Sequence, residues 1–145
     1  MRWLCISAAV CIIMAALTGA SADPQKTGVE QLLKKRTAVM DSILSRKISH
    51  KEGFSQLKEI EEGGLYSDDI RNLNSYRNSD CDRILSMKVK NMKRESHVAD
   101  LMTFNCDIVW TCSGYEGIYT ETGNYSVGAT ETGNGLKLVS FQLLK

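Results

Sequence analysis

The stretch LMTFNCDIVWTC, residues 101–112, decides the fold of this protein. From Met102 to Cys112, polar residues separate the apolar residues one by one, and Val109 is the exception. In an extended chain the even-numbered side chains therefore share one face, which carries Met102, Phe104, Cys106, Ile108, Trp110 and Cys112. Such strict alternation predicts a strand that is buried on one face only.

A weaker alternation before this stretch predicts a partner strand over residues 84–92. Leu85, Met87 and Val89 share one face of it. A hairpin centred on Ser96-His97 would place Met87 opposite Cys106, and the two apolar faces would then coincide. A slip of one residue would put the faces on opposite sides, so this register is the expected one.

The C-terminal part predicts more strands. Residues 118–130 indicate one long strand with a bulge near Gly123, although two shorter strands with a turn there are an alternative. Asn134-Gly135 is a favoured turn of a two-residue hairpin. A last strand is expected over residues 136–144, so the sheet would be a meander of about four antiparallel strands.

The part before residue 77 has helical spacing instead. Thr27 with Glu30, and Ser49 with Glu52, are two capping boxes that predict helix starts. Gly63-Gly64 predicts the end of the second helix, because glycine adopts the left-handed conformation at low cost. Ser67 indicates the start of a third, short helix. Helices followed by strands predict an α+β domain with the helices on one sheet face.

The N-terminus reads as an export signal. A positive start at Arg2, an apolar run and the small residues Ala20-Ser21-Ala22 are typical of a cleavable signal peptide. A retained signal anchor is the alternative. We expect residues 1–22 to be removed and residues 23–145 to form a single domain, with a helical part over 27–76 and a sheet part over 83–144. The product would be secreted or held in the cell envelope, with no transmembrane segment.

Three cysteines follow the signal peptide. Cys106 and Cys112 lie on one strand, roughly 20 Å apart, which is too far for a disulfide. The expected register places Cys81 opposite Cys112, so we hypothesise a Cys81–Cys112 disulfide with Cys106 a buried free thiol. The alternative is that all three are reduced and act as small apolar residues.

Charge excludes some functions. Without Arg2 the chain carries equal numbers of basic and acidic residues, so a nucleic-acid binder is not expected. Residues 26–51 are mainly basic and residues 59–82 mainly acidic. The two segments could be solvated helix faces that attract each other. Alternatively, a basic patch with Lys34, Lys35 and Arg36 could bind an anionic partner such as a cell-wall polymer or lipid headgroups.

No motif of catalysis, metal binding or cofactor binding occurs. His50 and His97 have no other ligand residues at metal-binding spacing and are expected in exposed loops. Asp107 is the one carboxylate within the main strand, and it could act as a general base only if its face lined a pocket. Tyr115, Tyr119 and Tyr125 could form a binding strip, or they could be ordinary strand residues.

The layout resembles the cystatin/NTF2-like domains of small exported proteins of Gram-positive bacteria. The resemblance rests on residues 29–73, Trp110 and residues 115–125, and covers most of the chain after residue 22. It implies helices ahead of a curved meander, and it supplies no catalytic residues. We therefore expect a non-enzymatic module that binds an unknown protein or cell-surface polymer. A pocket enzyme that uses Asp107, or a structural subunit that oligomerises through a strand edge, are the alternatives.

Overall fold

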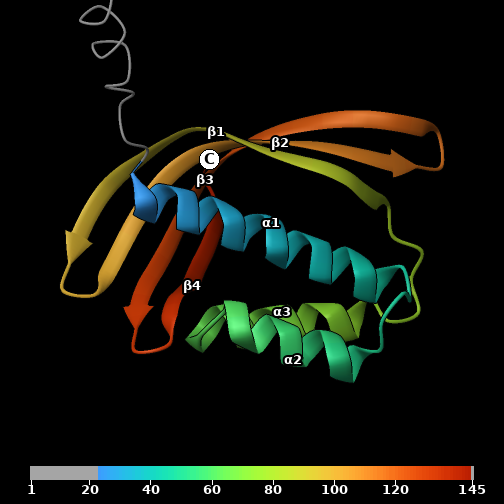
Figure 1. Ribbon diagram of the computed structural model, residues 1–145. Helices are drawn as coiled ribbons and strands as arrows, with labels where there is room; N and C mark the ends of the chain where they lie inside the picture. Colours follow the sequence, from blue (N-terminus) through green and yellow to red (C-terminus); the bar gives the residue numbers. More distant parts are fainter. Residues whose placement is uncertain (1–22, 145) are drawn as a thin grey trace, which may run out of the picture.

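The structure of the protein, a computed structural model, describes residues 23–144. Within these residues the elements are α1 (Pro24–Leu44), α2 (His50–Ile60), α3 (Gly63–Ser75), β1 (Arg83–Val98), β2 (Leu101–Gly114), β3 (Gly117–Thr132) and β4 (Gly135–Leu143). The strands pair antiparallel in the order β1-β2-β3-β4. Figure 1 shows the helices on one side of the curved sheet. The predicted α+β architecture is therefore confirmed, while the predicted signal peptide, residues 1–22, lies outside the described residues.

The even-numbered face of β2 forms the centre of the core, as its alternation predicts. Met102, Phe104, Cys106 and Ile108 are at most 1% exposed. The helices add their own buried apolar residues to the same cluster, among them Val29, Leu33, Ile43, Leu57, Ile60 and Leu73. The inner face of the sheet is thus covered by the helices. In residues 23–144, no helix is both long and apolar enough to cross a membrane.

The helix starts are only partly as predicted. Ser49 caps α2, since its side chain accepts a hydrogen bond from the Glu52 N–H at 3.1 Å. The start predicted at Thr27 is wrong, because α1 already begins at Pro24. Asp23 caps it by accepting from the Gln25 N–H at 3.0 Å, and proline fits the first helical position well because it needs no N–H partner there.

The junction between α2 and α3 also differs from the prediction. Gly63-Gly64 begins α3 instead of ending α2, which stops at Ile60. Glu61 turns extended and forms a parallel bridge with Leu138 of β4, and the Glu62 N–H donates to the Leu138 carbonyl at 2.9 Å. Pairing with a strand therefore ends α2, a long-range cause that local sequence does not reveal. Gly63 has a positive φ of 63° and lets the chain turn into α3.

The register of β1 on β2 is shifted from the expected one by three to six residues along the hairpin, and by four at Met87. Met87 pairs with Trp110 rather than with Cys106, and Ala99 and Asp100 form the turn between the strands. The predicted turn at Ser96-His97 is therefore wrong. A shift by an even number keeps the faces, so Met87 still packs against the core. Leu85 falls in a register irregularity and is 52% exposed.

This register also decides the cysteine pairing. Ile84 takes the position opposite Cys112, and Cys81 lies before β1 begins. Cys81, Cys106 and Cys112 are all free, so the hypothesised Cys81–Cys112 disulfide is not formed. Cys106 is a buried free thiol, and its burial raises the pKa of the thiol to about 11.

The third strand is continuous, which settles the choice between one long strand and two short ones. The β2–β3 pairing runs without a shift through Gly123, so the expected bulge is absent there. A register shift occurs instead between β3 and β4, at Gly128-Ala129. The last hairpin turns at Gly133-Asn134, one residue earlier than predicted, because Thr132 already pairs with Gly135.

Gly123 is required by the ring that covers it. A Cβ there would lie 2.7 Å from Cε2 of Tyr125 and 2.9 Å from Cδ1 of Leu143. We expect Gly123→Ala to lower the free energy of unfolding by about 1–3 kcal/mol, because the ring must move out of its packed position. Urea denaturation measures this change. Gly133→Ala is the control, since nothing lies within 4 Å of its added Cβ, and equal losses in both variants would contradict the packing argument.

Candidate functional site

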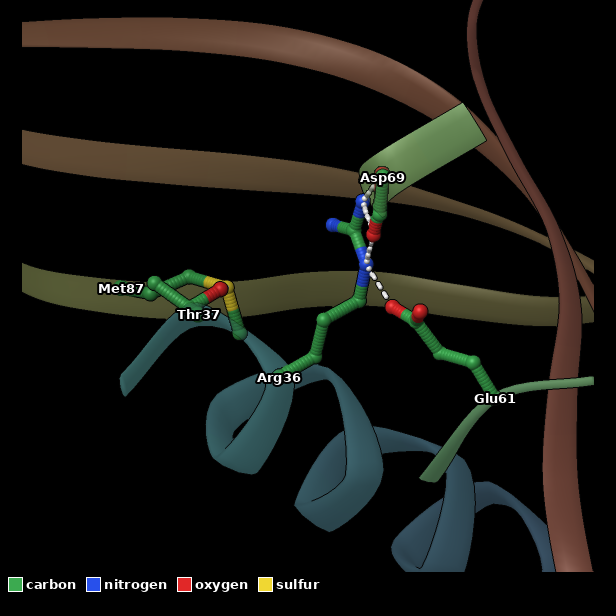
Figure 2. Close-up of polar contacts among 5 residues, drawn as sticks. All are labelled: Arg36, Thr37, Glu61, Asp69 and Met87. Carbon is green, nitrogen blue, oxygen red and sulfur yellow. Dashed lines mark hydrogen bonds and ion pairs between the residues drawn. The ribbon is translucent and has the colours of Figure 1, made fainter. Parts of the chain in front are cut away.

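Three charged side chains lie buried between the helices and the sheet, and we name Arg36, Glu61 and Asp69 the charge cluster. Arg36 comes from α1, Asp69 from α3, and Glu61 from the junction between α2 and α3. The Arg36 Nε donates to Glu61 Oε1 at 2.6 Å and to Asp69 Oδ2 at 2.8 Å. Its Nη2 donates to Asp69 Oδ1 at 2.7 Å. Figure 2 shows the guanidinium held between the two carboxyl groups.

One guanidinium cannot balance two ionised carboxylates. Burial, followed by the neighbouring Asp69, raises the pKa of Glu61 to about 8, although Arg36 acts in the opposite direction. The second oxygen of Glu61, Oε2, is buried without a hydrogen-bond partner, which costs more for an ionised oxygen than for a protonated one. Burial and Asp69 thus favour the protonated form of Glu61, and in that form the charge cluster is neutral as a whole.

Aromatic rings continue from the charge cluster across the inner face of the sheet. The Arg36 guanidinium carbon lies 4.9 Å from the centre of the Phe141 ring. Phe141 stacks on Tyr125 with ring centres 4.7 Å apart, and Trp110 meets Tyr125 edge-on. The Trp110 Nε1 donates to the Tyr125 hydroxyl at 3.2 Å. These side chains occupy the space between the helices and the sheet beside the cluster.

A hollow of about 540 Å³ opens on the surface where the α1–α2 loop meets the end of α3. Its charged lining is basic only, with Arg46, Lys47 and Arg77, and the imidazole of His50 also lines it. We name it the basic hollow. The rest of its lining is apolar or neutral: Ile43, Leu44, Ile48, Ser49, Tyr76 and Asn78. Positive charge and concave shape coincide at this hollow, and no acidic residue lines it.

A smaller hollow of about 340 Å³ lies between α2 and the β3–β4 hairpin. It contains both signs of charge, since Lys58, Glu59 and Lys137 line it. The Lys137 Nζ also donates to the Lys58 carbonyl at 2.8 Å. Its cations are partly used inside the protein, so it is a weaker candidate than the basic hollow.

Asp107 lies on the solvent side of the sheet, opposite the core face of β2. It accepts hydrogen bonds from the side-chain amides of Asn91 at 2.7 Å and Asn124 at 2.8 Å. These bonds lower the pKa of its carboxyl group. A general base in a pocket needs a raised pKa instead, and Asp107 lines neither hollow. The geometry thus gives the candidate catalytic residue a structural role between strands.

The three candidate basic residues of α1 do not form one patch. Arg36 is only 7% exposed and belongs to the charge cluster, so its expected role in docking a partner is wrong. Lys34 pairs with Glu30 at 2.6 Å on the exposed side of the helix. Lys35 is exposed, and neither lysine lines a hollow.

The three candidate tyrosines have three different environments. Tyr125 belongs to the internal stack, where it is half-buried. The Tyr119 hydroxyl donates to Asp82 at 2.7 Å, which raises the pKa of that hydroxyl. Tyr115 is fully exposed in the β2–β3 turn. Two of the three side chains thus bind partners within the protein.

The two edges of the sheet are protected differently. On β4, Leu138 pairs with the α2–α3 junction. β1 has three register shifts against β2 and carries Lys88, Lys90 and Lys93, all exposed. Bulges and lysines on an edge strand oppose pairing with another strand. The arrangement therefore gives no support to oligomerisation through a strand edge.

Sequence reasoning missed Glu61, Asp69 and the basic hollow. One signal was present, because Arg36 and Thr37 interrupt the apolar stripe of α1, and a charge on a core-facing position requires a buried partner. The partners could not be chosen, since the acidic segment of residues 59–82 offers seven carboxylates. His50, expected in an exposed loop, is the first residue of α2 and packs edge-on against Phe54.

Comparison with known proteins places the fold. No family model and no curated protein sequence matches this chain. The β subunit of benzoate 1,2-dioxygenase from Burkholderia mallei ATCC 23344 is similar in structure, with a TM-score of 0.53 and 14% identity over 79% of this chain and 86% of that one. The intermembrane space region of the chloroplast protein ARC6 follows with a TM-score of 0.46 and 13% identity, over 79% and 95% of the two chains.

The dioxygenase β subunit has an NTF2-like fold. The helices on one face of a four-stranded antiparallel sheet thus form an α+β fold that is similar to the fold of this subunit. At such low identity the likeness concerns the fold alone. Function must therefore be argued from the site.

The proton on Glu61 has a measurable consequence. A folded-state pKa above the ordinary 4.5 means that the native protein binds this proton more tightly than the unfolded chain. The associated stability is complete below pH 4.5 and is lost as the pH rises to about 8. We expect the unfolding free energy of the wild type, relative to Glu61→Gln, to fall by up to about 1.4 kcal/mol per pH unit across this window.

Denaturation curves at several pH values test this expectation, with Glu59→Gln as the control. Glu59 is exposed in the last turn of α2, two residues before Glu61, so its variant should follow the wild type at every pH. A constant difference between the wild type and Glu61→Gln from pH 5 to pH 8 would show that Glu61 is ionised throughout.

Proposed function

We propose that this protein is an exported, non-enzymatic binding module that acts at the cell surface or in the envelope. The observation that carries the proposal is the filled interior. The inner face of β2 is covered by the helices, and the charge cluster and the aromatic stack occupy the space beside it. A module of this kind would bind its partner on the outside.

The alternative of a pocket enzyme depends on Asp107 and finds less support. Its carboxyl group faces solvent, is bonded to two amides and has a lowered pKa. Proton abstraction would require the opposite environment, in which burial raises the pKa. Among the described residues, no three His, Cys, Asp or Glu side chains gather at a spacing that could hold a metal ion.

Expression of the full chain tests the proposed export. We expect expression of the full chain in a secreting bacterial host to give extracellular or envelope-bound protein whose first residue is Asp23, because Ala20-Ser21-Ala22 fits the signal-peptidase site. N-terminal sequencing of the exported product measures this. A chain that stays in the cytoplasm and begins at Met1 would remove export from the proposal.

Partner binding is tested on the cell envelope. We expect C-terminally tagged protein to bind isolated envelopes of its own host saturably, because a specific partner has a limited number of sites. Sedimentation of the envelopes followed by quantification of the tag gives the binding curve. An excess of untagged protein should displace the tagged one. Binding that is absent, or that rises linearly without displacement, would refute a binding module.

A further inference from the structure

We propose that the basic hollow is a binding site for the phosphate group of an anionic ligand. The inference rests on the proposed function, because it names the class of ligand that such a binding module takes. Three observations support it. The charged side chains of the lining are all basic, Arg46 has a left-handed backbone conformation, and the start of α2 lines the hollow.

The cations of the basic hollow, Arg46, Lys47 and Arg77, form no ion pair within the described residues, although Lys47 acts at longer range on Asp41. No carboxylate lines the hollow. The closest acid on α1, Asp41, is bound by Arg83 through two hydrogen bonds of 2.9 Å. Like charges that converge in a concave site attract counter-ions, so the hollow is prepared for an anion.

Arg46 lines the hollow although its backbone conformation favours glycine. Its φ is 59°, the left-handed region that favours glycine at this point after a helix. The Arg46 N–H donates to the Ile43 carbonyl at 3.0 Å and the Lys47 N–H to the Ser42 carbonyl at 2.9 Å. Backbone groups thus already satisfy the end of α1, and the arginine side chain is not needed for that purpose.

The start of α2 adds a further attraction for an anion. Ser49 and His50, the cap and the first residue of α2, both line the hollow. Unpaired N–H groups and the helix dipole make a helix start favourable for negative charge. Two separate parts of the chain, the α1–α2 loop with the start of α2 and the segment after α3, thus line the same hollow.

A phosphate group fits this set of donors. Guanidinium groups bind phosphate through two parallel hydrogen bonds, while lysine acts as a mobile point charge. The volume of about 540 Å³ exceeds what one phosphate fills, and apolar Ile48 and Tyr76 line part of the hollow. The phosphate would therefore belong to a larger molecule, such as an anionic envelope polymer.

Titration with pyrophosphate, followed by amide NMR shifts of the protein, tests the site. The shifts should concentrate at residues 46–50 and 76–78. The double variant Arg46→Gly/Arg77→Ser should bind about tenfold more weakly or worse, because it loses both phosphate-binding forks. The control Lys34→Ser/Lys35→Ser removes the same charge from the exposed side of α1 and should bind like the wild type. Equal weakening in both double variants, or shifts spread over the whole surface, would overturn the proposal.

Arg46→Gly alone separates binding from helix capping. Glycine adopts the left-handed backbone readily, so this variant should unfold at the same temperature as the wild type or slightly higher while its affinity for pyrophosphate falls. An unchanged affinity for pyrophosphate would exclude Arg46 from the site. The same conclusion would follow if the variant unfolded at a lower temperature but showed the same amide NMR shifts on titration as the wild type. Citrate, which carries carboxylates only, should bind more weakly than pyrophosphate. Equal binding would replace the phosphate assignment by a general anion site.

The envelope assay keeps the two proposals distinguishable. If the wild type and Arg46→Gly/Arg77→Ser bind envelopes equally well, the proposal of a binding module is kept, but the basic hollow is not the site that binds the envelope. If pyrophosphate binds in the hollow but envelopes do not retain the wild type, the site stands and the proposed cellular role fails.

Discussion

The position of Arg36 constrains the helical layer. A guanidinium on the core side of α1 needs negative partners within reach, because a lone buried charge is too costly to keep. It obtains them from α3 and from the α2–α3 junction, and the Phe141 ring of β4 lies against it. One side chain thus fixes how α1, the following helix pair and the last strand lie relative to each other. Burial and the neighbouring Asp69, acting against the guanidinium, raise the pKa of the second carboxyl group, Glu61.

Local patterns were sufficient where one face of an element had to be buried. The alternation of residues 101–112 predicted β2 and its core face, and the Ser49–Glu52 pair predicted the start of α2. Periodicity also predicted the antiparallel meander and the helical layer. These features depend on residues close in sequence, so the sequence alone could predict them.

The errors arose where distant pairing decides the structure. The end of α2 depends on Leu138, which lies in the last strand, and the β1 register depends on irregularities spread along the whole hairpin. Around Met87 the register is wrong by four residues, an even number that still brings the apolar faces together, so hydrophobic matching could not detect the error there. The expected cysteine pairing followed from that register and was lost with it. The candidate site was missed for a related reason, since Arg46, His50 and Arg77 come together only when the ends of the helices meet.

The contacts of the last strand also say something about the order of events during synthesis. Leu138 and Phe141 lie close to the C-terminus, yet they hold the α2–α3 junction and cover Arg36. Until β4 has left the ribosome, the junction has no strand to pair with and the guanidinium has no ring beside it. Contacts between such distant parts of a chain form slowly. The helical half therefore stays incompletely packed until β4 has been synthesised, so its native contacts form late although its residues come first in the sequence.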